Sequence, residues 1–116
     1  MVNEHPVPWD IWYAKVHFEE FPNEFKKRPV LIIEKKEGEN LLAVYISLKI
    51  TSHPPRHEFA GEYVISQWRE AGLKMPSTVR TYRYFELEER NLIRKLGRLE
   101  ISDIRAVQAI LDGRYL

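Results

Sequence analysis

The chain has no cysteine, no long hydrophobic run and no strong net charge of either sign. The absence of cysteine excludes disulfide bonds and thiolate catalysis, and it fits a cytoplasmic location. No run of about 18 apolar residues is present, so we expect no membrane span. Residues 1–6 lack the basic-then-apolar pattern of a signal peptide. With a formal net charge of +1, the protein is not a uniformly basic nucleic-acid coat.

The charges that are present are distributed unevenly along the chain. Residues 74–98 contain seven Lys or Arg against three Glu, whereas residues 1–25 contain five acidic residues against one lysine. This asymmetry permits a local anionic ligand. Charged segments more often serve only to keep a surface solvated, so the pattern alone does not demand such a ligand.

The length of 116 residues and an apolar content of 44% indicate one domain, spanning 1–116, with 1–8 as an extended lead-in. Apolar alternation and continuous apolar runs predict strands over residues 11–18, 29–34, 41–51, 63–65 and 77–85. Short helices are expected over 66–71 and 88–96, ended by Gly72 and Gly97, before a C-terminal helix at 101–111. These elements predict a mainly β (α+β) fold, with a partly closed sheet or small barrel.

The predicted strand 41–51 has two different faces. Its alternation places Leu42, Val44, Ile46, Leu48 and Ile50 on one face, and Ala43, Tyr45, Ser47, Lys49 and Thr51 on the other. We expect the first face to be core. The second predicts a polar wall that carries a phenol, an ammonium group and two hydroxyls.

Four short motifs resemble the PemK/MazF family of type II toxin–antitoxin growth inhibitors: Asp10-Ile11-Trp12, Arg28-Pro29-Val30, Ile50-Thr51-Ser52 and Pro76-Ser77-Thr78-Val79-Arg80. The resemblance covers roughly residues 10–112. It implies a small Src-homology-like, CcdB–MazF-type, partly open β-barrel that is usually a homodimer. It also implies a metal-independent, sequence-selective endoribonuclease that cleaves single-stranded RNA to a cyclic phosphate and a 5′-hydroxyl end. The implied partner is a cognate acidic antitoxin, and we expect no cofactor.

Metal-free RNA cleavage needs a few well-placed groups. One helps to deprotonate the ribose 2′-hydroxyl, one assists the departing 5′-oxygen, and donors hold the phosphorane between them. The resemblance implies catalytic roles for Arg28, Thr51 and Arg80, with Ser52 beside the phosphate. A guanidinium suits this task because it can donate to two phosphate oxygens at once and keeps its charge.

Other residues are candidates for RNA binding. Lys49 shares the polar face with Thr51, and Asp10 matches an acidic position of the family, although Trp9 replaces the usual preceding glycine. Tyr82 and Arg83 belong to an aromatic and basic strand that is typical either of a base-stacking platform or of a core strand.

Two histidines, His53 and His57, flank a proline pair directly after the Thr51-Ser52 motif. A histidine is a natural acid or base at neutral pH, and His53 is a candidate for RNA contact or catalysis. The spacing of four with no third ligand nearby is a poor zinc signature, so we expect no metal site.

The sequence also departs from the family. Tyr82 stands where the PemK branch has an acidic residue, and the MazF branch has an apolar residue in place of Arg80. The loop before Arg28 contains no glycine. Two alternatives therefore remain open: a toxin of the same fold that binds a protein, like the CcdB gyrase poisons, and a catalytically inactive regulator that binds nucleic acid or a partner.

Overall fold

A computed structural model describes residues 5–17, 21, 23–38, 42–56 and 60–113. Six strands and one α-helix occur within these residues: β1 (Asp10–His17), β2 (Phe25–Glu37), β3 (Ala43–Thr51), β4 (Glu62–Val64), β5 (Thr78–Glu88), β6 (Leu92–Arg98) and α1 (Ile101–Gly113). A short 3-10 helix, Glu89–Asn91, connects β5 to β6. No described helix is long and apolar enough to span a membrane.

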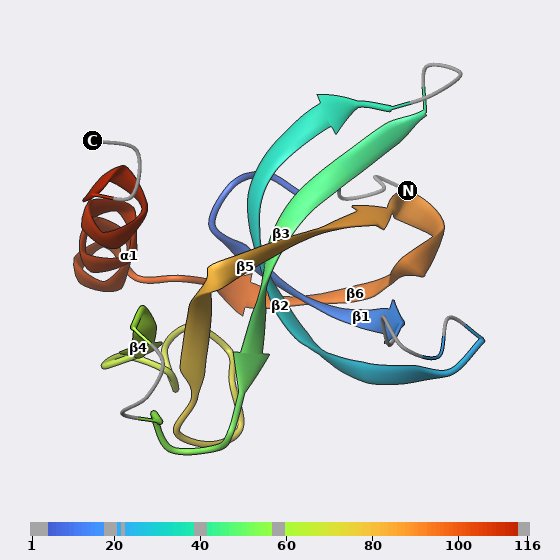
Figure 1. Cartoon of the computed structure of the whole chain (residues 1–116). Coiled ribbons are helices and arrows are strands. Elements are labelled where there is room, and N and C mark those ends of the chain that lie inside the picture. Colours follow the sequence, from blue (N-terminus) through green and yellow to red (C-terminus); the bar gives the residue numbers. More distant parts are fainter. Residues whose placement is uncertain (1–4, 18–20, 22, 39–41, 57–59, 114–116) are drawn as a thin grey trace.

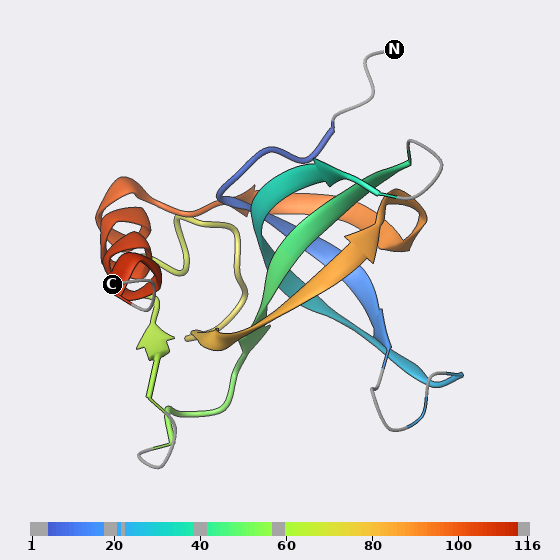
Figure 2. The ribbon, with the colours of Figure 1, turned by 45° about the horizontal axis from the view of Figure 1, so that its top comes forward.

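The strands form one antiparallel sheet in the order β4-β5-β3-β2-β1-β6. Figure 1 shows this sheet as strongly twisted and curled, with α1 at one side. Figure 2 shows α1 beside β4, and β1, β2 and β6 farther from it. The two edge strands, β4 and β6, do not pair with each other, so the curled sheet stays open. The prediction of a mainly β, partly open barrel with a C-terminal helix is thus confirmed.

Two hydrophobic cores lie on opposite faces of the curled sheet. Strand residues such as Ile11, Leu31 and Leu48 form the first core together with Val107 and other apolar residues of α1. The second core contains alternate residues of the same strands, including Trp12. Because both faces are covered, β1 and β2 bury nearly continuous apolar runs.

One carboxylate joins α1 to the segment that follows β4. Asp103, in the first turn of α1, is fully buried and accepts hydrogen bonds from the Tyr63 hydroxyl, the Ser66 N–H (3.0 Å) and the Gln67 N–H (2.9 Å). Burial alone would raise the pKa of Asp103, but the bonds from Tyr63, Gln67 and Ser66 outweigh it and lower that pKa. Burial and Asp103 together raise the pKa of Tyr63 to about 12.

The helix expected over 66–71 is only a single helical turn. The N–H groups of Gly72 and Leu73 donate to the carbonyls of Arg69 (3.1 Å) and Trp68 (3.0 Å), which is the hydrogen-bond pattern of a Schellman helix end. Gly72 has a φ of 92°, as this motif requires. The predicted stop at Gly72 is therefore correct, although the helix before it is shorter than expected.

The helix expected over 88–96 is wrong. This segment contains the end of β5, the 3-10 helix and most of β6, which pairs with β1. Gly97 does not end a helix; it permits a close approach of two backbones. A Cβ atom on Gly97 would lie 2.1 Å from the carbonyl oxygen of Ala71, and one on Gly72 would lie 2.1 Å from that of Leu96.

The predicted faces of the strand 41–51 also need correction. Tyr45 and Ser47 are completely buried, with Tyr45 in the second core, whereas Leu42 precedes β3 and is 62% exposed. The curl of the sheet covers the first part of the expected polar wall. Lys49 and Thr51, at the far end of β3, are the residues of that face that line a cleft.

Candidate functional site

The cleft lies where β2 and β3 diverge. Their pairing ends at Val30 and Lys49, next to Pro29, which has no N–H with which to donate a ladder hydrogen bond. Beyond this point, the start of β2 and the end of β3 separate in both ribbon views (Figures 1 and 2). A cleft of about 800 Å³ occupies this region.

The charge of the cleft lining is one-sided. Among the described residues, five cationic side chains line it and no Asp or Glu does: Arg28, Lys49, Lys74, Arg80 and Arg94. They come from β2, β3, β5, β6 and the segment before β5. The whole chain has a net charge of only +1, and its folding brings five of its cations to this cleft. Such a surface attracts anionic ligands.

Arg28 and Arg80 face the cleft as two like charges. Burial and the charge of Arg80 both lower the pKa of Arg28, which nevertheless remains a guanidinium cation. Arg80 lies 3.6 Å from a carboxylate oxygen of Glu62, measured from its Nε. No carboxylate in the described part of the chain forms an ion pair with Arg28. An anion between the two guanidinium groups would relieve their repulsion.

The end of β3 supplies hydroxyl groups to the same cleft. Thr51 is only 8% exposed, and its Oγ1 accepts a hydrogen bond from the His53 N–H at 3.2 Å. This bond uses a lone pair, so the hydroxyl proton of Thr51 can still be donated to a ligand. Ser52 and His53 follow on the exposed rim. The structure thus brings Arg28, Lys49, Arg80 and the Thr51-Ser52-His53 segment together in one cleft, and their roles there stay predictions.

Asp10 lies elsewhere. It is 1% exposed at the start of β1, where it accepts hydrogen bonds from the Val7 N–H (3.0 Å) and the Trp12 indole (3.3 Å). Arg98 and Lys95 of β6 lie 3.4 Å and 3.7 Å from its Oδ1. These contacts join the entry segment to β1 and β6, and Asp10 does not line the cleft.

The remaining predicted residues are also outside the cleft lining or outside the described side chains. The Tyr82 hydroxyl accepts a hydrogen bond from Arg56 at 3.0 Å. The side chain of Arg83 and the whole of His57 lie outside the described part of the structure. Roles for Asp10, Tyr82 and Arg83 in RNA binding stay predictions.

Sequence reasoning missed Tyr13, Lys74 and Arg94 in the cleft. The guanidinium of Arg94 lies 5.6 Å from the centre of the Tyr13 ring, because β1 and β6 pair at these two residues. Because the sequence predicted a helix over 88–96, the pairing of these residues with β1 was not expected. Among the described residues, no group of three or more His, Cys, Asp or Glu is arranged to hold a metal ion.

Comparison with known proteins identifies the family. The sequence matches, over residues 8–113, the family described as PemK-like, MazF-like toxin of type II toxin–antitoxin system. The chain belongs to this family. Among solved structures, it is similar to the Mycobacterium tuberculosis toxin MazF-mt6, with a TM-score of 0.66 and 24% sequence identity over 91% of this chain and 95% of that chain. At this identity the likeness shows the fold. No curated protein sequence matches this chain significantly.

Family membership gives one sequence departure a physical explanation. Trp9 stands directly before Asp10, where the resemblance implied a glycine, and it has a φ of 75°. A positive φ costs little for glycine and more for other residues. Trp9 is held there by backbone bonds to Ile32 (2.7 Å) and Leu99 (2.9 Å). Trp9 thus adopts a backbone conformation that favours glycine, and these two backbone bonds hold it there.

Proposed function

We propose that this PemK/MazF-family toxin is an endoribonuclease that cleaves single-stranded RNA without a metal ion. The observation that carries this proposal is the cleft in which Arg28, Arg80 and Thr51 meet, where the described lining residues include five cations and no carboxylate. A polyanion is the natural ligand of such a cleft, and its apolar lining residues, including Leu73 and Leu96, give bases a surface to contact.

The scissile phosphate would bind between Arg28 and Arg80. The 2′-hydroxyl oxygen attacks the adjacent phosphorus, and the bond from phosphorus to the 5′-oxygen breaks as the new bond forms. The 2′-hydroxyl loses its proton, the departing 5′-oxygen gains one, and the products are a 2′,3′-cyclic phosphate and a 5′-hydroxyl end. DNA lacks the nucleophile and would remain intact.

The residues of the cleft act on the charge that develops in this reaction. Negative charge grows on the non-bridging oxygens of the phosphorane, where the two guanidinium groups and the Thr51 hydroxyl can donate hydrogen bonds. Preformed donors need no reorganisation at the moment of reaction. Lys49, Ser52 and His53 would bind the sugar–phosphate backbone along the rim.

We also propose two partners. A cognate acidic antitoxin would inhibit the toxin by placing carboxylates where RNA phosphates bind. A second copy of the chain would lengthen the shallow cleft into a groove that holds several nucleotides. Light scattering should therefore give the mass of a homodimer, and a monomer at high micromolar concentration would contradict this.

The test of the proposed activity uses a long RNA of mixed sequence and DNA of the same sequence, each incubated with the toxin in EDTA. We expect discrete RNA fragments, the same fragments without EDTA, and intact DNA. An RNA pool that survives intact would contradict the proposal. Activity that disappears in EDTA and returns with a divalent ion would contradict the metal-free mechanism.

A further inference from the structure

A buried carboxylate, Glu62, stands behind the cleft. Glu62 is the first residue of the edge strand β4 and pairs with Arg80 of β5 across the sheet. Its side chain is only 2% exposed. Glutamate is rarely buried this far unless its charge is compensated, so the contacts of Glu62 indicate its role.

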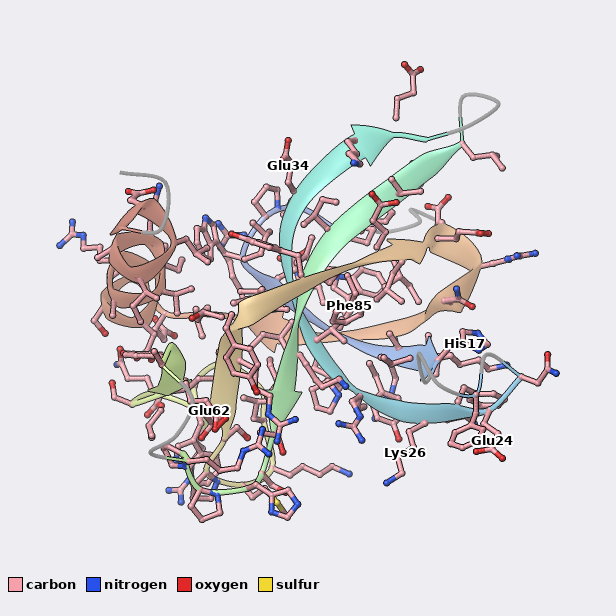
Figure 3. The ribbon with its side chains drawn as sticks, in the orientation of Figure 1. His17, Glu24, Lys26, Glu34, Glu62 and Phe85 are labelled. Carbon is pink, nitrogen blue, oxygen red and sulfur yellow. The ribbon has the colours of Figure 1, made fainter. Side chains whose placement is uncertain are left out.

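Both oxygens of Glu62 face arginines. The Oε2 atom lies 3.6 Å from Arg80 Nε, and within the described structure neither of these buried atoms has a hydrogen-bond partner. The Oε1 atom accepts a hydrogen bond from the Arg56 N–H at 2.9 Å and lies 3.5 Å from Arg56 Nε. Figure 3 shows Glu62 among nitrogen-tipped side chains beside the lower part of β5.

This arrangement controls where the Arg80 guanidinium lies. Arg28 and Arg80 carry like charges and repel each other; burial first, and then the charge of Arg80, lower the pKa of Arg28. Without a counter-charge, Arg80 would move away from Arg28 towards solvent. Glu62 lies at the Nε edge of the guanidinium, so the two Nη groups are left to donate to a phosphate.

The same carboxylate also contacts the segment 52–56, whose first residues lie on the rim of the cleft. Arg56 ends the segment that begins with the rim residues Ser52 and His53, and Glu62 binds both its backbone and its side chain. Arg56 also donates to the Tyr82 hydroxyl at 3.0 Å, which connects this segment to β5. One buried charge therefore contacts both Arg80 and the segment 52–56.

We propose that Glu62 is a positioning residue for the cleft, acting through Arg80 and Arg56. This inference rests on the proposed ribonuclease function. Glu62 touches neither RNA nor the reacting atoms. It keeps the Arg80 guanidinium in the geometry that the phosphorane needs, and it prevents the two cleft arginines from separating.

The substitution Glu62→Gln tests this role because it keeps the shape of the side chain and removes its charge. We expect kcat to fall by about 10- to 100-fold, since small displacements of a catalytic group cost this much. The affinity for a 2′-O-methyl RNA, which cannot be cleaved, should stay equal or increase, because a negative charge near the phosphate site is lost. A general collapse of the cleft would instead weaken binding as well.

Glu86→Gln is the matched control. Glu86 lies on β5, like Arg80, and pairs with Lys36 at 2.9 Å, but its side chain is 54% exposed and does not line the cleft. We expect wild-type kcat and KM for this variant. In an Arg80→Ala background, Glu62→Gln should lower kcat by much less than it does in the wild type. Both substitutions act through the Arg80 guanidinium, so their effects on kcat should not add.

Two outcomes separate this inference from the proposed function. If the wild-type protein cleaves RNA and Glu62→Gln has the same kcat, the positioning role is wrong and the ribonuclease function stands. If the wild-type protein cleaves no RNA, the function fails, and the NMR signal of the Arg80 Nε–H decides the positioning role. Its hydrogen exchange should accelerate in Glu62→Gln, and unchanged exchange would overturn the inference.

Discussion

At the scale of single residues, two guanidinium groups share one cleft although they repel each other. Burial and the charge of Arg80 lower the pKa of Arg28, so the ligand-free cleft is electrostatically unfavourable at this position. In the proposed reaction a bound phosphate would remove the repulsion, and a phosphorane with more negative charge would remove more of it. The interaction would therefore favour the transition state over the substrate, which is the condition for catalysis.

Arg28→Ala should remove cleavage without unfolding the protein. We expect a loss of at least about 100-fold in kcat, as for the removal of one donor to a developing oxyanion. The melting temperature should be unchanged or slightly higher, because Arg28 has no carboxylate partner among the described residues and its loss relieves repulsion with Arg80. Normal cleavage, or an unfolded variant, would show that the role of Arg28 is misassigned.

The value of kcat should depend on the Thr51 hydroxyl. Thr51→Val keeps the shape but loses both the donor to phosphate and the acceptor of the His53 N–H. We expect kcat to collapse, and stability to fall by about 1 kcal/mol for the lost hydrogen bond. Thr51→Ser is the control and should retain most of the activity. Equal kcat values for the Val and Ser variants would contradict a role for the hydroxyl.

At the scale of elements, α1 depends on the Asp103 carboxylate. Asp103→Ala leaves the Ser66 and Gln67 N–H groups and the Tyr63 hydroxyl without their acceptor. These three hydrogen bonds are part-buried. At about 1 kcal/mol net for each, we expect a loss of about 3 kcal/mol in urea unfolding at pH 7. An unchanged midpoint would contradict this account of how α1 is held.

The same carboxylate predicts how stability depends on pH. The pKa of Asp103 is lower in the folded protein than in the unfolded chain. Its contribution is therefore complete above the unfolded value of about 3.9 and is lost as the pH falls through the lower folded pKa. The stability difference between wild type and Asp103→Asn should be constant from pH 7 to about pH 5 and shrink below about pH 4. A difference that grows on acidification would contradict the sign of this shift.

The elements also show what the sequence could predict. Apolar runs and alternation correctly located β1, β2, β3 and α1, because burial of these segments follows local periodicity. Leu92 and Leu96 lie four residues apart, a spacing that fits a helix. This segment is a strand instead because it pairs, with irregular register, with β1, more than 75 residues earlier in the chain. Local patterns carry no information about such pairing.

Part of the cleft was predictable for a similar reason. Arg28, Thr51 and Arg80 lie in short motifs that resemble the family, whereas Arg94 and Glu62 reach the cleft region through strand pairing. In β5, three residues lie between Arg80 and Tyr84, whose partners on β3 are adjacent. Simple alternation could not foresee this irregularity. The carboxylate beside Arg80 comes from Glu62, its pairing partner on β4, whereas position 82 is a tyrosine.

At the scale of the whole molecule, a nearly neutral protein has a cleft whose charged lining residues, among those described, are all cations. The five cations of the lining would guide anions to the site, and the strength of this effect depends on ionic strength. RNA and an acidic antitoxin would compete for the same charges. Both ligands should therefore respond to salt, and the two should exclude each other.

Binding experiments can test this competition. We expect the affinity for 2′-O-methyl RNA to fall with salt. The log–log slope should be no steeper than about −3.5 for each cleft that the RNA occupies, since each of the five cations contributes at most about −0.7 for a single strand. The product of the neighbouring gene, if it is the antitoxin, should displace this RNA. Simultaneous binding of both ligands would contradict occupation of the cleft by the antitoxin.

The most direct test of the central claim is the chemistry of the RNA ends. A mixed-sequence RNA is digested in EDTA by wild type and by Arg28→Ala, and the fragments are analysed by mass spectrometry. Attack by the 2′-hydroxyl within this cleft predicts 2′,3′-cyclic phosphate and 5′-hydroxyl ends from the wild type and no fragments from the variant. Fragments with 5′-phosphate and 3′-hydroxyl ends, or identical fragments from both proteins, would contradict it.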